Sequence, residues 1–163
     1  MVSQKEGLVF GYSEDIETKK SIEKEGLIFQ PYTDVEKMAA FAAKKLEKSG
    51  YTLSKSYPLP DYQNLLQKQS NKIEVPGGTV KISVRAIELV GANQETVLMV
   101  IAQSKTVIDA LEIWTLDASR LVAPNKHFSD AKAIYLHALH NAELNPKVID
   151  QANQEIKNEM QSN

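Results

Sequence analysis

The chain has 163 residues, a mass of 18.2 kDa, 42% hydrophobic residues and a formal net charge of -2. It contains no cysteine, which excludes disulfides, thiolate catalysis, and zinc or iron–sulfur sites with cysteine ligands. Arginine occurs only at Arg85 and Arg120, and with a pI near 5.9 this composition argues against nucleic-acid binding. The length predicts a single domain, residues 1–163, that is large enough to bury a core.

Apolar runs in the sequence are short. The longest, Met38 to Ala43 and Val97 to Ala102, are too short to cross a bilayer, and the N-terminus has no long apolar region. We therefore expect neither an integral membrane segment nor a secretory signal in this sequence. The cytoplasm is the favoured location, and an exported domain trimmed after its signal stays open as an alternative.

A short motif occurs twice near the N-terminus. Residues 5–10 read Lys-Glu-Gly-Leu-Val-Phe, and residues 24–29 read Lys-Glu-Gly-Leu-Ile-Phe, 19 residues later. Each copy predicts a short apolar strand and then a helix that is capped by Ser or Thr and has an acidic first turn. Chance recurrence and true duplication both stay open.

The first firmly predicted helix spans residues 34–49. Thr33 is the expected N-cap, with Glu36 at the position that a capping box requires. Apolar residues recur at helical spacing, three lysines near the end complement the helix dipole, and Gly50 follows. These lysines, Lys44, Lys45 and Lys48, suit either a solvated face or a basic patch for an acidic partner.

A proline-flanked segment occupies the middle of the chain. Residues 51–57 alternate as a strand does, and Pro58 and Pro60 then interrupt regular structure. Asp61 is the expected cap of a short helix behind them. The apolar and aromatic side chains on this wet segment predict a partner-binding surface, together with the sheet edge beside it; these residues are Tyr57, Leu59, Tyr62 and Leu65. The alternative is that all four pack inward over the core.

Three consecutive β-type segments follow in residues 79–117 and predict an antiparallel meander. The apolar phase changes from Val84 to Ile87, so a β-bulge is expected within two residues of Ala86. Residues 97–102 are apolar throughout, which indicates a strand covered on both faces. Trp114, the only tryptophan, lies among apolar strand positions and is expected in the core.

Two helices are predicted after the meander. The first spans residues 129–142, with Ser129 as the expected N-cap and an apolar stripe along one side. The second, 146–160, begins at Pro146 and has only a narrow stripe, so it is expected on the surface. The fold class is therefore α+β, with an antiparallel sheet of four to six strands packed by the helices near 34–49 and 129–142.

Reactive side chains form no recognisable catalytic or metal-binding motif. His137 and His140 are close on one helix, with Glu143 nearby, but zinc helices more often use a different spacing and need further ligands. His127, Ser129 and Asp130 contain the residue types of a hydrolase triad, whose members are assembled in space rather than along the chain. The meander carries carboxylates without a sign that two converge: Glu88, Asp109, Glu112 and Asp117. We expect no metal and no cofactor, and the catalytic residues are unknown.

Two stretches, residues 40–53 and 127–134, carry a hydrophobic pattern that resembles the small Mog1/PsbP-like domains. The order of strand, amphipathic helix, strand, meander and C-terminal helix is similar as well. The insertion at 58–71 and the helix after Asn145 depart from that pattern. Members of such families are mostly non-enzymatic, so the resemblance implies binding to another protein.

The sequence therefore favours a non-catalytic protein-binding module, such as a chaperone, an immunity protein or an accessory subunit. The alternative is a small-molecule-binding domain or an unrecognised enzyme, with a pocket between sheet and helices. The partner expected is another protein, and neither its identity nor the oligomeric state follows from the sequence.

Overall fold

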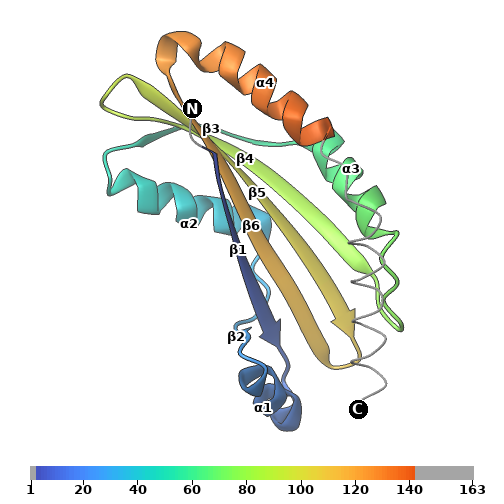
Figure 1. Ribbon diagram of the computed structural model, residues 1–163. Coiled ribbons are helices and arrows are strands. Elements are labelled where there is room, and N and C mark those ends of the chain that lie inside the picture. Colours follow the sequence, from blue (N-terminus) through green and yellow to red (C-terminus); the bar gives the residue numbers. More distant parts are fainter. Residues whose placement is uncertain (1–2, 142–163) are drawn as a thin grey trace.

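The computed structural model describes residues 3–141, with side chains from Gly7 onward. One sheet of six strands and four α-helices make up this part of the chain (Figure 1). In chain order the elements are β1 Ser3–Tyr12, α1 Ile16–Lys24, β2 Ile28–Phe29, α2 Val35–Glu47, β3 Thr52–Pro58, α3 Pro60–Ser70, β4 Val80–Val90, β5 Glu95–Ile108, β6 Leu111–Pro124, the 3-10 turn Asn125–His127 and α4 Phe128–Asn141.

The sheet is mixed but mostly antiparallel. Its strand order is β2-β1-β6-β5-β4-β3, and only β1 and β2 run parallel. The predicted α+β class and the meander are confirmed, with two differences. The sheet is not purely antiparallel, and the meander reaches Pro124 because β5 and β6 pair in register from Ile108 opposite Leu111 to Glu95 opposite Pro124.

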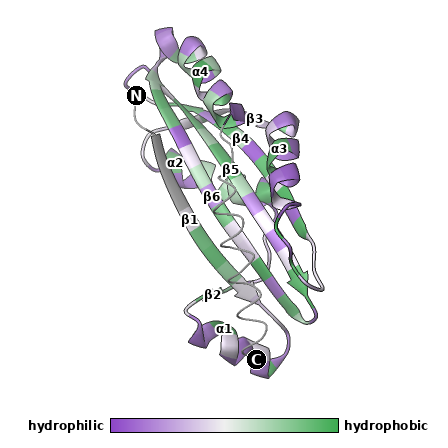
Figure 2. Ribbon diagram, turned by 45° about the vertical axis from the view of Figure 1, so that its right-hand side comes forward, coloured by the Kyte–Doolittle hydropathy of each residue, from purple (hydrophilic) through white to green (hydrophobic). Residues whose placement is uncertain are grey.

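Helices cover both faces of the sheet. On one face, α3 and α4 pack on alternate residues of β4, β5 and β6, among them Val84, Leu98 and Leu121. On the other face, α2 packs on the intervening residues, including Ile87, Leu89 and Ile101. Figure 2 shows the consequence in hydropathy: the central strands carry most of the hydrophobic residues, whereas α1 and α3 are largely hydrophilic. Coverage of both faces explains why residues 97–102 are apolar throughout.

The bulge predicted near Ala86 is wrong. β4 pairs with β5 without a shift from Val80 to Val90. Ala86, Ile87, Glu88 and Leu89 are all buried because the sheet is covered on both sides there, so the apparent change of phase reflects two-sided burial and not an extra residue. The register shift occurs instead in the neighbouring strand β3, between Leu53 and Lys55.

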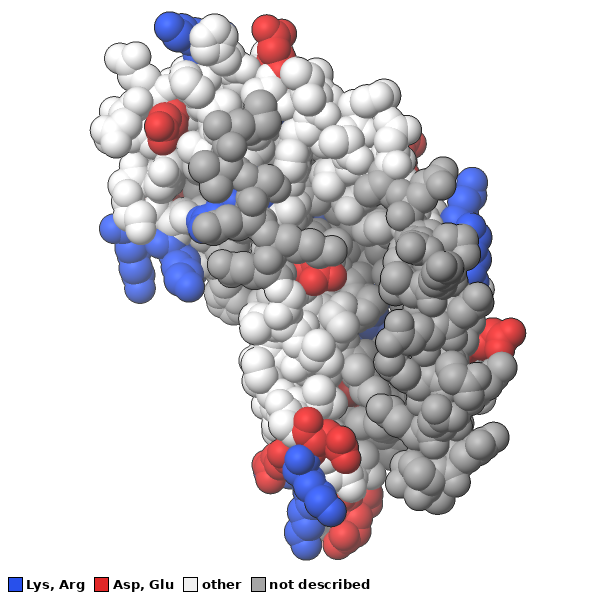
Figure 3. Space-filling model, viewed as in Figure 1, with Lys and Arg blue, Asp and Glu red and all other residues white. Residues whose placement is uncertain are grey.

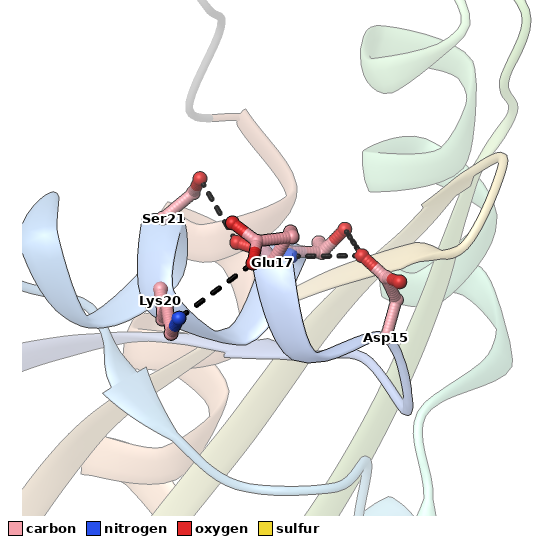
Figure 4. A network of polar contacts seen from close by, with 5 residues as sticks. Asp15, Glu17, Lys20 and Ser21 are labelled. Carbon is pink, nitrogen blue, oxygen red and sulfur yellow. Dashed lines mark hydrogen bonds and ion pairs between the residues drawn. The ribbon is translucent and has the colours of Figure 1, made fainter.

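The ends of the two copies of the repeated motif lie in adjacent parallel strands, with only Ile28 and Phe29 of the second copy in β2. Phe10 in β1 is opposite Ile28 in β2, and Gly11 is opposite Phe29. Asp15 caps the intervening helix α1: its Oδ2 accepts hydrogen bonds from the backbone N–H and the hydroxyl of Thr18 (Figure 4). The same figure shows the ion pair between Lys20 and Glu17 and the hydrogen bond from Ser21 to the Glu17 carbonyl.

The N-cap assigned to the second helix is wrong. Asp34, and not Thr33, caps α2: its Oδ1 accepts a hydrogen bond of 2.9 Å from the backbone N–H of Lys37. Asp34 follows Asp15 by 19 residues, so the repeat includes the helix caps. The Thr33 carbonyl accepts a hydrogen bond from Gln103 on β5 instead. The strand–helix unit is thus built twice with one capping chemistry.

Three further helix predictions meet different outcomes. α3 exists, but it starts at Pro60 with Leu59 at the N-cap and no side-chain cap, so the expected role of Asp61 is wrong. α4 starts one residue before Ser129, directly after the 3-10 turn. The predicted helix 146–160 lies outside the described residues. No helix between residues 3 and 141 is long and apolar enough to pass through a membrane.

Trp114 lies in the core as predicted, with an exposed fraction of 0%. Its ring stacks on Phe10 with 4.0 Å between centroids, and Tyr32 meets it edge-on. The indole N–H donates a hydrogen bond of 3.0 Å to the Gln30 carbonyl. One residue of β6 therefore joins the repeat strand β1 to the loop that precedes α2.

Candidate partner-binding surface

The four residues predicted to bind a partner lie where β3 ends and α3 begins. Tyr57, Leu59 and Tyr62 are partly buried and pack against the core cluster beneath α3 and α4. Leu65 is also half-buried. The Tyr62 ring lies 5.8 Å from the ring of His140 on α4. These side chains therefore join α3 to the sheet and to α4, and what faces solvent here is mainly the backbone edge beside them.

Tyr57 belongs to a charged cluster between β3, β4 and α4. Its hydroxyl donates a hydrogen bond to Oε2 of Glu88, and the Nζ of Lys132 lies 2.6 Å from the same oxygen. The Lys132 ammonium also lies over the Tyr57 ring, 5.0 Å from its centroid. The Glu88 side chain is 6% exposed and that of Lys132 is 27% exposed. One carboxylate thus links two sheet strands to a helix.

Electrostatics in this cluster favour the charged pair. Burial acts to raise the pKa of Glu88, but the hydrogen bonds from Lys132 and Tyr57 and the nearby lysines outweigh it, so the pKa lies below its usual value. Burial acts to lower the pKa of Lys132, and its contacts with Glu88 and Tyr57 raise it above the usual value. Burial and the hydrogen bond to Glu88 raise the pKa of Tyr57. Neither Tyr57 nor Lys132 is thereby activated as a nucleophile near neutral pH.

Strand β3 forms one end of the sheet, and it is exposed. It pairs with β4 on one side only, and every residue from Thr52 to Ser56 is exposed. Ser54 is the residue that the register shift leaves without a partner in β4. Lys55 lies opposite Glu88, and Pro58 ends the strand. A lysine, an irregular register and a proline are devices by which edge strands avoid pairing with copies of themselves.

Helix α3 covers the part of the β4 edge that β3 does not reach. β3 pairs with β4 only from Arg85 to Val90. Beyond that, Oε1 of Gln63 accepts a hydrogen bond of 3.0 Å from the Val84 N–H, and Oε1 of Gln67 accepts one of 2.8 Å from the Ile82 N–H. The Gln67 amide also donates to the Val80 carbonyl at 2.8 Å. Two glutamines one helical turn apart thus take the place of a strand.

Basic side chains on the elements around β3 form two separate groups. Figure 3 shows them where α2 ends and on the outer side of α3. Acidic residues are fewer on the same elements, namely Glu47, Asp61, Glu74 and the buried Glu88. The basic residues on β3, β4 and the neighbouring ends of α2 and α3 are Lys44, Lys45, Lys48, Lys55, Lys68, Lys72, Lys81 and Arg85. Lys55 is the one charged residue of β3 itself, and the other basic residues lie on the elements that flank it.

Lys81 and Lys105 lie directly opposite each other on β4 and β5. Like charges at such a pair destabilise a sheet unless an acid offsets them. Lys105 has Glu112 at 3.8 Å, whereas Lys81 is exposed and has no hydrogen bond or ion pair with the described part of the chain. α3 covers the part of the β4 edge from Val80 to Val84, which we call the half-edge. Lys81 lies within it, so a cation is available there for an incoming carboxylate.

The other candidate groups do not converge. His137 contacts Asn141 and His140 contacts the Leu136 carbonyl, and His127, Ser129 and Asp130 are all exposed with no hydrogen bond joining them in the described chain. Within residues 3–141 no group of three or more potential ligands is placed to hold a metal ion. The absence of a zinc site at His137 and His140 stays a prediction, because Glu143 lies outside the described residues.

The meander carboxylates are dispersed. Glu88 is paired with Lys132, and Glu112 accepts a hydrogen bond from the Tyr32 N–H on the opposite face of the sheet. Asp109 lies in the β5–β6 turn, and Asp117 lies beside Gly7 on β1. No two of these four are joined to each other, so the geometry provides no general acid–base pair among them.

A small hollow of 270 Å³ lies between the β1–α1 turn and the β5–β6 hairpin, lined by residues that include Tyr12, Ser13, Glu14 and Glu112. The carboxylates in its lining are groups that could bind a small cation. However, Glu112 is engaged by Tyr32 and Lys105, and Ser13 accepts a hydrogen bond from the Asp15 N–H. It is therefore a weaker candidate for binding than the β3 edge.

Comparisons with known proteins give no match to this chain among family models, curated proteins or solved structures. The geometry of the β3–α3 side is therefore the basis for the proposals below. The residues that organise the β3–α3 side include four that the sequence did not single out as site residues: Gln63, Gln67, Glu88 and Lys132. Two glutamines at helical spacing directly after a strand-ending proline were the available signal for the first pair.

Proposed function

We propose that this protein is a non-catalytic protein-binding module, and that it binds an extended acidic segment of a partner protein along the outer edge of β3. The observation that carries the proposal is the position of β3: it ends the sheet, and its residues from Thr52 to Ser56 are exposed. A strand added there would find unpaired backbone N–H and C=O groups, which is a common mode of peptide recognition.

Charge supports an acidic partner. Lys55 lies within this edge, and Lys48 follows α2 next to the start of β3. A second copy of the same strand would bring Lys55 against a basic surface, whereas an acidic segment would find a complementary one. The edge is thus open to a partner of opposite charge more than to itself.

The residues predicted from the sequence have an indirect role in this proposal. Tyr57 and Tyr62 hold β3 and α3 against the core, and thereby fix the shape of the edge. Leu59 lies between β3 and α3, and Leu65 is a half-buried residue of α3. A chaperone, an immunity protein and an accessory subunit all suit this mode of binding, which needs a rigid edge and no reactive group.

The test uses short synthetic peptides of extended, alternating pattern, one acidic and one with lysine in place of each glutamate. We expect the acidic peptide to bind and the basic peptide to bind at least about tenfold more weakly. Ser54→Pro, which removes an N–H and places a ring on the edge, should weaken acidic binding by about tenfold or more with little change in melting temperature. Lys24→Glu, on the distant helix α1, is the charge control.

The same variants identify the natural partner. Proteins from the native host that the unmodified chain captures, and that Ser54→Pro loses, are partners of the β3 edge. The proposal fails if acidic and basic peptides bind alike, or if Ser54→Pro folds normally and binds the acidic peptide as tightly as the unmodified chain.

A further inference from the structure

Gln63 and Gln67 occupy hydrogen-bonding positions that a β-strand would occupy. In an antiparallel ladder, the N–H and C=O groups of alternate residues point to the same neighbour, so Val80, Ile82 and Val84 present theirs to the side away from β5. The two glutamine side chains satisfy the Val80 carbonyl and the N–H groups of Ile82 and Val84. This half-edge is closed by side chains and not by main chain.

The cover has features of an element that can move away. α3 begins without a side-chain cap, and Pro58 and Pro60 flank its start. Its outer positions are polar, and Gln69 is its one buried residue, while Tyr62 and Leu66 pack against the core cluster as partly buried residues. Three hydrogen bonds from flexible side chains are also a modest barrier, because each is worth only about 1 kcal/mol net.

We propose that the half-edge of β4 from Val80 to Val84 is a second docking site, which the partner's extended segment enters by displacing α3. This inference rests on the proposed function, that this side of the sheet receives an acidic strand. The entering segment would lie in line with β3, where Pro58 ends the protein's own strand. It would replace the glutamine contacts with backbone hydrogen bonds.

The chemistry of the segment follows from the two faces of β4. Residues opposite Ile82 and Val84 would lie on the face where these two side chains are buried, 7% and 2% exposed, and where Tyr62 and Leu66 now pack. Residues opposite Lys81 would lie on the other face, next to a lysine that faces Lys105 across the strands. The fitting segment therefore alternates apolar and acidic side chains, with a carboxylate for Lys81.

Displacement makes a specific prediction about affinity. If the segment binds only when α3 has moved, its apparent dissociation constant is raised by the rarity of that state. Removing the glutamine hydrogen bonds should then tighten binding, whereas the loss of an ordinary contact surface would weaken it. The effect expected of Gln63→Ala/Gln67→Ala is tightening by about tenfold or more.

The experiment is performed in the Ser54→Pro background, so that the β3 edge is closed and any gain arises at β4. The probe is the synthetic peptide alternating valine and glutamate, measured by calorimetry, with circular dichroism to check folding. We expect Gln63→Ala/Gln67→Ala to bind it more tightly than its parent, and Lys81→Glu to reverse that gain. Asn64→Ala, an exposed position of the same helix, should leave affinity unchanged.

Hydrogen exchange provides the second readout. The amides of Ile82 and Val84 should exchange faster in the glutamine variant without peptide, and slowly again with peptide bound. If the double variant does not fold, Gln67→Glu keeps an acceptor for Ile82 but loses the donor to Val80, and should shift affinity in the same direction. Unchanged or weaker binding in the folded variant overturns this inference. The β3 proposal is judged separately, by the effect of Ser54→Pro itself.

Discussion

Lys132 on α4 and Glu88 on β4 form the ion pair that ties the last described helix to the sheet, with 2.6 Å between Nζ and Oε2. Glu88 is nearly fully buried and Lys132 is about a quarter exposed. The pair itself adds little net stability, because burying two charges is costly. Removal of one partner should be strongly destabilising, because it leaves the other charge buried without compensation. The Tyr57 hydroxyl, bonded to the same carboxylate, extends the link to β3.

Lys132→Met should therefore destabilise the protein by about 2 kcal/mol or more at neutral pH, since it leaves the Glu88 carboxylate buried with only Tyr57 as a donor. The double variant Glu88→Leu/Lys132→Met should recover much of this loss, because an apolar pair replaces the ion pair. Urea unfolding of both variants measures the difference. A single variant as stable as the unmodified protein would contradict the role assigned to the pair.

Glu88 should make the stability depend on pH in opposite directions in the unmodified protein and in Lys132→Met. In the unmodified protein the pKa of Glu88 is lowered, so its stabilisation is present above the unfolded value and is lost as pH falls through the folded pKa. In Lys132→Met, burial dominates and raises that pKa, so the protein should gain stability relative to the unmodified chain as pH falls toward about 4. Thermal unfolding from pH 7 downward provides the comparison.

Removal of the tyrosines should reveal their structural role. Tyr57→Ala/Tyr62→Ala removes two partly buried rings from the core cluster and one hydrogen bond to Glu88. We expect a loss of about 3 kcal/mol or more in unfolding free energy without any partner present. If instead the melting temperature barely moves while peptide affinity falls, the two rings belong to the recognition surface directly, as the sequence first indicated.

Substitutions at the N-terminus of α2 should distinguish Asp34 from Thr33 as the capping residue. Asp34→Ala should lower stability by about 1 kcal/mol, because the Lys37 N–H loses its acceptor. Thr33→Ala should have a smaller effect, because the structure uses the Thr33 carbonyl, through Gln103, and not its hydroxyl as a cap. Chemical denaturation of the two single variants decides the matter. A larger loss in Thr33→Ala would restore the capping box predicted from the sequence.

Gly11 lies where the repeat strand β1 meets α1. A Cβ at this position would stand 2.9 Å from Cγ2 of the buried Ile22 and 3.4 Å from Cδ1 of Leu27. Gly11→Ala should therefore cost about 1–2 kcal/mol by pushing α1 away from the sheet. Ile22→Ala removes both γ carbons that the new Cβ would meet, so Gly11→Ala/Ile22→Ala should cost less than the sum of the two single variants in the same unfolding experiment.

Sequence patterns determined the features of this protein that depend on neighbours along the chain. Alternation and apolar runs located the strands of the meander, and helical spacing located α2 and α4. The position of Trp114 among apolar residues was enough to place it in the core. Each of these signals arises within one or two helical turns or one strand, where local periodicity dictates which side chains are buried.

The tertiary structure decided which distant residues meet. Lys132 and Glu88 are 44 positions apart, and Gln67 reaches Ile82 across 15 positions. No local pattern encodes these contacts, because they depend on the strand order, which places β3 at the end of the sheet and lets α3 cover the part of β4 that it leaves open. Glu88 contributed to the apparent change of phase in β4. A carboxylate between apolar residues indicates a solvent-facing position in sequence, but the Glu88 side chain is buried and faces Lys132.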